Sequence, residues 1–422
     1  MERLRQRLGG RLPVDAIAVT GQMHAAVLAD AGGRAVRPAL LWLDRRAGAE
    51  VSEVARAWGS RDAAAVTGSP PGAELILPKL LWLRRHEPAA LGAAHRVLAV
   101  KDWVRWSLGG TPVAEPTDAS GTGMLDLRTL AWDAALLEAL GLPSALLPAL
   151  APSAAVDGEL SPGWAARLGL RAGTPLAAGA GDLPAAVLGS GAGPGQPVIN
   201  LGSAAQVAVV GRPGAMPRAA QLFCHPDPGL RIALGALLAA GLALGWARQV
   251  LGNVEPAPPS EVAPLLFVPH LAGERGPAAG LRSRGAFIGL ALETTAREMA
   301  GAAAYGVAMA CRERLEDLAA GGGVPLVLAE EPGARDWAER LAGVLGRPVS
   351  LAQGGSPSAR GAALLAGLAV GALNWDALPP VAAVQVCSRP EAAAQLAALY
   401  AAYLRARPAV AAASEALTAG RP

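Results

Sequence analysis

The chain has 422 residues, more than one hydrophobic core usually supports, so two domains are expected. With 52% apolar and 17% charged residues it can bury large cores, which excludes an intrinsically disordered chain. The formal net charge is only +3 and the basic residues are scattered, so the composition does not point to nucleic acid. The three cysteines are far apart, which favours reduced thiols in a cytoplasmic protein over a disulfide framework.

Short apolar runs alternate with helical patterns along the chain, and this alternation predicts an α/β protein. Strands are expected at residues 14–19, 25–30, 95–100, 175–181, 196–202 and 205–211. Helices are expected at residues 47–58, 132–140, 295–318 and 335–345. A further apolar run at 232–247 predicts a buried helix, because it is shorter than the roughly 20 residues that a membrane span needs.

The boundary between the two expected domains falls at residues 171–174, just before a stretch rich in glycine and poor in charge. Such a composition suits close approaches between neighbouring backbones. The sequence therefore predicts domains at 1–172 and 173–422. The N-terminal residues mix Glu2 with arginines and have no long apolar core, so we expect no signal peptide.

A polar turn, Gln22-Met23-His24, separates two strand-like runs near the start of the chain. Loop ends face solvent or ligand, so this segment is either a simple exposed turn or part of a binding site. Further on, Asp44 follows the apolar run LLWL. At that position the side chain would be a helix N-cap, unless a ligand recruits it.

Asp182, in the segment AGAGDLPAAVLG, is a carboxylate isolated among small and apolar residues. It follows an expected strand, and Leu183 and Pro184 after it are expected to begin a helix. A carboxylate at the C-terminal end of a strand suits acid–base chemistry in α/β proteins, and a helix N-cap is the alternative. Lys101 and Asp102, by contrast, have the apolar neighbours typical of a buried ion pair.

Seven segments of the chain combine into a resemblance when they are taken in order. They are AVTGQMHAAVLADAGGRAVRPALLWLDRR, PKLLWLRRHEP, KDWVRWSLGGTP, TDASGTGMLDLRTLAWD, AGAGDLPAAVLGSG, FVPHLAGERGP and RGAFIGLALETT. From about Val14 to Leu368 the chain resembles the FGGY carbohydrate kinases, most closely the xylulokinases among them. The resemblance implies two actin-like (ribonuclease H-like) α/β ATPase domains with a cleft between them, in which the γ-phosphoryl group of MgATP passes to a sugar hydroxyl.

On the sugar side, the resemblance implies that Gln22, Met23 and His24 contact a ketose, D-xylulose or a related sugar. Asp182 matches the catalytic base of the family, which takes the proton of the attacking hydroxyl. Trp42 and Asp44 would lie near the pocket wall. Two positions depart from the family pattern: Leu183 stands where an Asn usually follows the base, and Tyr305 stands where a Glu is usual.

On the nucleotide side, the resemblance implies ATP and Mg²⁺ as cofactors, with contacts from Gly202, Ser203 and Gly333. No residue is assigned as a metal ligand. The turn LGSAAQ replaces the usual Leu-Gly-Thr-Ser, so Ala204 lacks a hydroxyl. The adenosine-binding triple glycine is replaced by AEEPG at 329–333, whose two carboxylates would repel phosphates.

Family members begin with a β-hairpin whose Asp-x-Gly-Thr turn approaches the phosphates. The given sequence begins after it, so we expect a first domain that is incomplete at its N-terminus. Three hypotheses follow: a working sugar kinase whose given sequence starts late, a degenerate sugar-binding pseudokinase, or a decayed chain whose run at 14–19 is an open sheet edge. The sequence does not determine which ketose binds. It also leaves the oligomeric state open, and a homodimer is one option.

Overall fold

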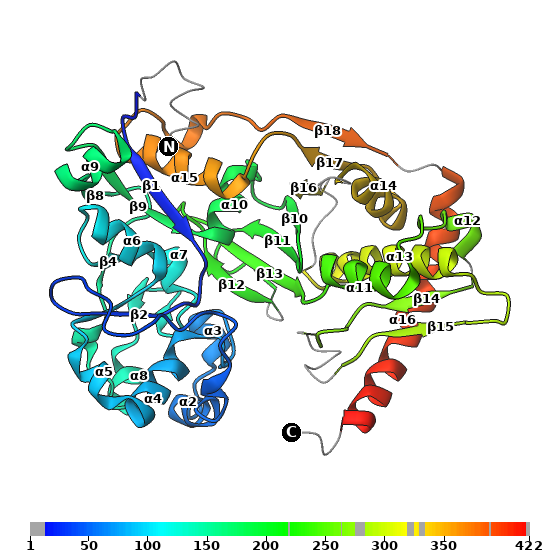
Figure 1. Ribbon diagram of the computed structural model, residues 1–422, viewed down its shortest axis with the longest axis horizontal. Coiled ribbons are helices and arrows are strands. Elements are labelled where there is room, and N and C mark those ends of the chain that lie inside the picture. The colour runs from blue at the N-terminus through cyan, green and yellow to red at the C-terminus, as the bar shows by residue number, and fades with distance from the viewer. Residues whose placement is uncertain are drawn as a thin grey trace.

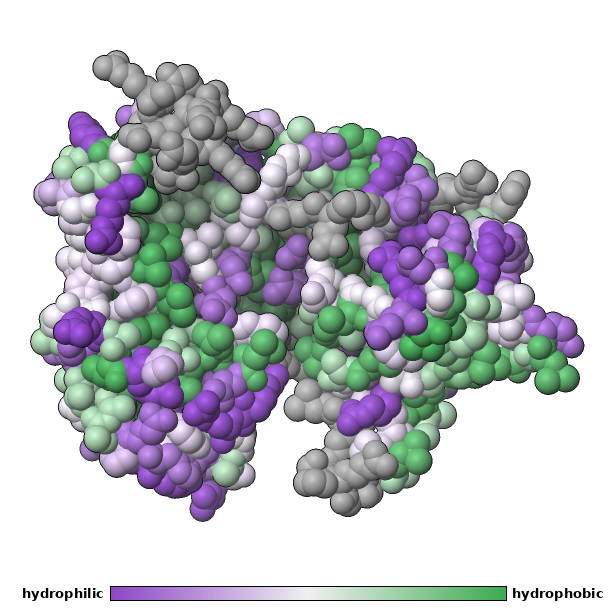
Figure 2. Space-filling view, viewed as in Figure 1, coloured by the Kyte–Doolittle hydropathy of each residue, from purple (hydrophilic) through white to green (hydrophobic). Residues whose placement is uncertain are grey.

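The computed structural model describes residues 13–217, 220–262, 264–274, 283–318, 325–328, 334–387 and 390–418. We divide its elements into an N-terminal part, from β1 to α10, and a C-terminal part, from β10 to α16. Figure 1 shows the two parts side by side along the long axis, with α15 reaching back beside α10. On the face in Figure 2 the surface is hollowed between them.

The elements of the N-terminal part are β1 (Ile17–Gly21), β2 (Val27–Ala29), η1 (Arg46–Gly48), α2 (Val51–Trp58), α3 (Ala63–Thr67), α4 (Ile76–His86), α5 (Pro88–Ala93), β3 (Arg96–Leu98), α6 (Val100–Leu108), β4 (Val113–Ala114), α7 (Pro116–Ala119), β5 (Leu125–Asp126), β6 (Ala131–Trp132), α8 (Ala134–Ala139), η2 (Ser144–Leu146), β7 (Ala149–Leu150), β8 (Val156–Glu159), α9 (Pro162–Leu168), β9 (Pro175–Gly181) and α10 (Asp182–Ser190). Those of the C-terminal part are β10 (Pro197–Leu201), β11 (Ala205–Gly211), β12 (Gln221–Cys224), β13 (Arg231–Leu237), α11 (Gly241–Leu251), α12 (Pro259–Val262), β14 (Leu266–Val268), β15 (Ala286–Ile288), α13 (Ala296–Asp317), β16 (Leu326–Leu328), α14 (Ala334–Leu345), β17 (Val349–Ala352), α15 (Pro357–Ala369), η3 (Trp375–Ala377), β18 (Ala383–Val386) and α16 (Pro390–Thr418). The expected α/β class is confirmed, and each strand expected from the sequence overlaps one in the structure.

The N-terminal part contains a three-stranded sheet of order β1-β9-β8. β1 runs parallel to β9, with Gly21 opposite Gly181, and β8 is antiparallel to β9. Because parallel strands end at the same edge of a sheet, the residues after β1 and after β9 are brought together. The boundary expected at residues 171–174 falls between β8 and β9, so this sheet contains strands from both sides of it.

The C-terminal part is built on a seven-stranded sheet of order β12-β13-β11-β10-β16-β17-β18. The buried helix predicted at 232–247 is wrong in its first half, because Arg231–Leu237 forms β13 and α11 begins only at Gly241. β13 pairs with β11 on one side and β12 on the other, and nearly all of it is buried. A strand covered in this way has a continuous apolar sequence, which periodicity alone does not separate from a buried helix.

Helices α10 and α15 pack closely, and two glycines make this approach possible. A Cβ on Gly189 would lie 1.9 Å from the carbonyl oxygen of Pro357, and one on Gly361 would lie 1.9 Å from that of Ala185. Ala185 and Leu188 of α10 pack with Leu365 of α15 in one buried cluster. This packing attaches the C-terminal part to α10, the helix that begins at Asp182. No helix within the described ranges has the length and apolar character to cross a bilayer.

Candidate active site

The turn after β1 lies against the start of α10. The carboxylate of Asp182 accepts a hydrogen bond at 2.8 Å from the backbone amide of Leu183, and the nearby backbone amide of Met23 also lowers its pKa. The Met23 side chain packs over Gly181, where an added Cβ would lie 2.6 Å from Met23 Cγ. The structure therefore brings Asp182 and the Gln22–His24 turn together, at the shared end of two parallel strands.

Burial raises the pKa of Asp182, and the backbone N–H groups of Leu183 and Met23 oppose that rise. The N-cap position of α10 is Gly181, so the alternative that Asp182 is the helix N-cap is wrong. Asp182 is instead the first residue of the helix, so α10 begins one residue before the start predicted at Leu183. A partly buried carboxylate that is oriented by a hydrogen bond from a backbone amide is suited to accept a proton from a neighbouring hydroxyl.

His24 has a backbone conformation that is rare for a non-glycine residue, with φ of 60°. Its Nδ1 lies 2.6 Å from the carbonyl oxygen of Gly121. Since a carbonyl only accepts, Nδ1 is the donor, and in the neutral ring Nε2 is then an acceptor. The phenyl ring of Phe223 packs against the imidazole in a T-shaped arrangement, with 5.9 Å between the ring centroids. The ring is thus oriented from two sides.

Trp42 and Asp44 lie on the loop between the Leu40 bridge and η1. Asp44 accepts hydrogen bonds from the backbone amide of Arg46 at 3.1 Å and from its guanidinium at 2.9 Å. The prediction that Asp44 caps a helix is wrong, because Arg45 is at the N-cap position of η1. Trp42 is 40% exposed, which leaves an indole surface open on this loop.

A series of buried, hydrogen-bonded polar side chains supports the end of β9. The Thr117 hydroxyl accepts a hydrogen bond from the Gly181 amide at 3.0 Å and donates one to Glu115 at 2.7 Å. Glu115 lies 3.2 Å from Lys101 Nζ, and the fully buried pair of Lys101 and Asp102 is 2.6 Å apart, as the sequence suggested. Thr117 is a supporting residue that sequence reasoning missed, because only the fold brings it to Gly181.

Asp118 belongs to the same series of buried polar side chains. Burial raises its pKa well above the usual value, and the nearby Asp102 and Glu115 raise it further, while Lys101 opposes the shift. Neither carboxyl oxygen of Asp118 has a hydrogen-bond partner among the described residues. Burial thus favours the neutral form of this carboxyl group.

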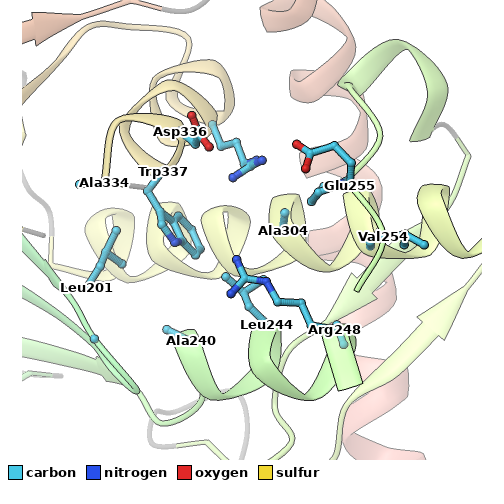
Figure 3. A pocket seen from close by; sticks show the side chains of 16 residues that line it. Leu201, Ala240, Leu244, Arg248, Val254, Glu255, Ala304, Ala334, Asp336 and Trp337 are labelled. Atoms are coloured by element: carbon cyan, nitrogen blue, oxygen red, sulfur yellow. The ribbon is translucent and has the colours of Figure 1, made fainter. Parts of the chain in front are cut away.

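Gly202 and Ser203 lie in the C-terminal part, in the turn between β10 and β11. Gly202 lines a cavity of about 200 Å³ together with residues of α11, α13 and α14. In Figure 3 the indole of Trp337 and the guanidinium of Arg248 point into this cavity, with Glu255 and Asp336 at its rim. Sequence reasoning missed Trp337 and Arg248, which no motif marks.

Gly333 and the neighbouring Glu330, Glu331 and Pro332 lie outside the described residues. Among the residues that the structure does describe, no group of three or more acidic, histidine or cysteine side chains is arranged to hold a metal ion. Tyr305, the other departure on the sugar side, is buried within α13.

The fold defines the class of protein. The crystal structure of a xyloylose kinase from Brucella ovis matches 97% of this chain with a TM-score of 0.85 and 30% identity, and the match covers 88% of that chain. Together with the carboxylate at the end of β9, this likeness defines a two-domain sugar kinase fold of mixed α/β type.

Sequence comparison identifies the family. Residues 11–189 match the N-terminal domain, and residues 216–370 the C-terminal domain, of the FGGY family of carbohydrate kinases. The chain is 34% identical over 377 residues to the xylulose kinase of Escherichia coli, covering 84% of this chain and 76% of that protein. It is 32% identical over 405 residues to the glycerol kinase of Thermus brockianus, covering 90% and 80%. The chain belongs to the FGGY family of carbohydrate kinases, which are ATP-dependent enzymes.

Proposed function

We propose that the protein phosphorylates a ketose, D-xylulose, to D-xylulose 5-phosphate with MgATP. The observation that carries the proposal is the packing of Met23 against Gly181 at the shared end of β1 and β9, which places the partly buried Asp182 carboxylate beside the Gln22–His24 turn. A hydroxyl between these groups would have an acceptor for its proton and a second partner for its orientation. The xylulose kinase of Escherichia coli supports the choice of sugar, whereas the glycerol kinase of Thermus brockianus makes glycerol the competing substrate.

The reaction needs little covalent chemistry from the protein. The sugar oxygen forms a bond to the γ-phosphorus, the bond from that phosphorus to the bridging oxygen of ADP breaks, and the hydroxyl proton passes to Asp182. His24 Nε2 would accept a hydrogen bond from another sugar hydroxyl and so select one orientation of the ketose. Met23, with only 5% of its surface exposed, would close the apolar side of the subsite.

In this proposal ATP binds in the cavity beside Gly202. Trp337 offers an aromatic face for a base, and Arg248 offers a cation for the negatively charged part of a nucleotide. Mg²⁺ in kinases is held mainly by phosphate oxygens and one or two carboxylates, so a dedicated protein cluster is not needed. When bound, the ion neutralises charge that develops on the phosphates.

The test is a coupled assay of ADP release with D-xylulose, other ketoses and glycerol as acceptors. We expect D-xylulose to give the highest kcat/KM and Asp182→Ala to lower it by about 10²- to 10⁴-fold. Phosphorylation of glycerol with a higher kcat/KM than any ketose would contradict the proposed substrate class.

A second candidate is sugar binding with little or no phosphoryl transfer. Ala204 lacks the family hydroxyl, and the turn around it is occupied with internal bonds: the Gly202 amide donates to the Ala204 carbonyl at 3.0 Å, and the Gly202 and Ser203 carbonyls accept from the start of α11. These groups are then not directed at phosphates. ATP binding in the millimolar range or weaker, with turnover below ~0.01 per second against the ~1 to 100 usual for kinases, would favour this candidate.

A further inference from the structure

One ammonium group joins three loops of the N-terminal part. Lys79 Nζ donates hydrogen bonds to the backbone carbonyl oxygens of His24 at 2.8 Å, Leu41 at 2.9 Å and Glu74 at 2.7 Å. An ammonium has three donors, and each is directed at a different loop. The His24 carbonyl belongs to the proposed ketose turn, and the Leu41 carbonyl directly precedes Trp42.

Lys79 is fully buried, at 0% exposure, near the start of α4. Both features are unfavourable for a cation, because burial removes hydration and the helix N-terminus carries partial positive charge. An apolar side chain of the same length would avoid these costs. The groups that offset them are three backbone carbonyls and the nearby carboxylates of Asp44 and Glu74, none of which lies on α4. The lysine therefore serves the arrangement of the loops and not an ion pair on its own helix.

The His24 carbonyl is held where the backbone most needs support. A non-glycine residue at φ of 60° is costly unless its surroundings over-determine it. The bond from Nζ fixes the peptide after His24, and the bond from Nδ1 to the Gly121 carbonyl fixes the ring. Without the first bond, the turn can relax and the position of the imidazole ring changes with it.

We propose that Lys79 is a positioning residue of the ketose site, whose ammonium sets the geometry of the Gln22–His24 turn relative to the loop that carries Trp42 and Asp44. The inference rests on the proposed function for the identity of the ligand. It predicts that Lys79 governs sugar recognition, since neither the nucleotide cavity nor Asp182 is among its contacts.

The pH dependence of sugar recognition provides a readout that a purely structural role would not affect. Burial lowers the pKa of Lys79 to about 8; Asp44 and Glu74 oppose this shift and Arg45 adds to it. Above that pH the amine has two N–H donors for three carbonyls, so one loop is released. The KM for the ketose should therefore rise as the pH increases from 7 to 9, while the KM for ATP follows a different profile.

The experiment compares Lys79→Met, which retains the length of the side chain without donors, with Leu83→Ala, a fully buried position one turn further along α4. We expect Lys79→Met to raise the ketose KM by about 10- to 100-fold, with a smaller change in kcat, and to abolish the rise of KM between pH 7 and 9. Leu83→Ala should lower the melting temperature without changing the ketose KM. If Lys79→Met does not fold, Lys79→Gln, which keeps two donors, should give a smaller rise in KM.

Hydrogen exchange separates failure of this inference from failure of the proposed function. The Asp44 amide, bonded to the Leu41 carbonyl, and the amides of residues 23–26 should exchange faster in Lys79→Met than in Leu83→Ala. A wild-type protein inactive with every ketose would defeat the proposed function, and the exchange data would still decide whether Lys79 fastens the loops. An unchanged ketose KM in an active Lys79→Met enzyme, or unchanged exchange in an inactive one, would overturn the inference.

Discussion

The carboxylate of Asp182 is partly buried in the fold and accepts a hydrogen bond from the Leu183 amide. Because burial raises its pKa, the charged form is disfavoured in the folded chain relative to the unfolded one. This group therefore stabilises the fold as the pH falls through its raised pKa and destabilises it at neutral pH. With Asp182 as the proposed base, we expect the acid limb of the rate profile to lie above the usual Asp value of 3.8.

Asp182→Asn separates catalysis from stability. The amide oxygen can still accept the hydrogen bond from the Leu183 amide, and no partly buried charge remains, so we expect a melting temperature at pH 7 equal to or above that of the wild type. Turnover with D-xylulose should fall by about 10²- to 10⁴-fold, because the proton acceptor is gone. Thermal melts and the coupled assay check both parts, and a folded Asn variant with wild-type turnover would exclude Asp182 as the base.

His24 contributes a ring and a strained backbone, and two variants distinguish these contributions. His24→Gly removes the ring but accepts φ of 60° without cost, so the loss it shows belongs to the side chain. We expect xylulose binding without ATP to weaken by about 1 kcal/mol or more, from one lost hydrogen bond. His24→Asn tolerates the same backbone conformation and keeps a hydrogen-bond acceptor. Its affinity for xylulose should therefore lie between those of the wild type and His24→Gly. Calorimetry with equal affinities for all three proteins would exclude His24 from the sugar site.

At the level of elements, the contact between α10 and α15 links Asp182 to the C-terminal part. The Ser358 hydroxyl donates to the Asp182 carbonyl at 3.2 Å, and Arg360 donates to the Gly189 carbonyl at 2.5 Å. Since the helices touch through Gly189 and Gly361, a side chain at either position must push them apart. Displacement of α10 would move the carboxylate at its first residue.

Gly361→Ala is therefore expected to lower both stability and kcat. Overpacking of this kind typically costs about 1–3 kcal/mol, and a small misplacement of the base lowers the rate. Gly245→Ala, on α11 where an added Cβ meets nothing within 4 Å, is the matched control and should be neutral or stabilising. Denaturant unfolding and steady-state kinetics give the comparison, and a Gly361→Ala protein that behaves like Gly245→Ala would contradict this account of the packing.

Elements with a clear local pattern could be predicted from the sequence, and contacts between distant segments could not. The run at 175–181 and the helix after it were predicted because small apolar residues, Asp182 and Pro184 follow one another in the chain. β13 was missed because a strand covered on both sides shows no alternation. Lys79 was not singled out in the segment PKLLWL, although a lone lysine in an apolar run was an available signal. Its three hydrogen-bond partners are separated from it by up to 55 residues in the chain.

For the whole molecule, the β12–β13 pair of the C-terminal part is hydrogen-bonded to the N-terminal part. The Leu222 amide donates to the Gly68 carbonyl at 2.7 Å, and the Cys224 amide lies 3.2 Å from the Ser120 hydroxyl. Arg231, only 6% exposed, donates to the Leu127 carbonyl at 2.6 Å. Figure 1 shows this edge of the seven-stranded sheet reaching toward α7. Together with the contact between α10 and α15, these bonds lead us to expect that the two parts unfold as one unit.

Arg231→Leu should weaken that coupling. The substitution leaves the Leu127 carbonyl without its charged donor, and an unsatisfied buried acceptor costs about 1–3 kcal/mol. Because the lost bond joins the two parts, we expect the calorimetric transition to broaden or split as well as shift to lower temperature. Arg128→Leu is the control: Arg128 follows Leu127 in the chain but is 74% exposed and pairs with Asp126, so its loss should leave one sharp transition at nearly the wild-type temperature. If Arg231→Leu shifts the transition without broadening it, the two parts are held together by the contact of α10 with α15, and the β12–β13 pair contributes stability alone.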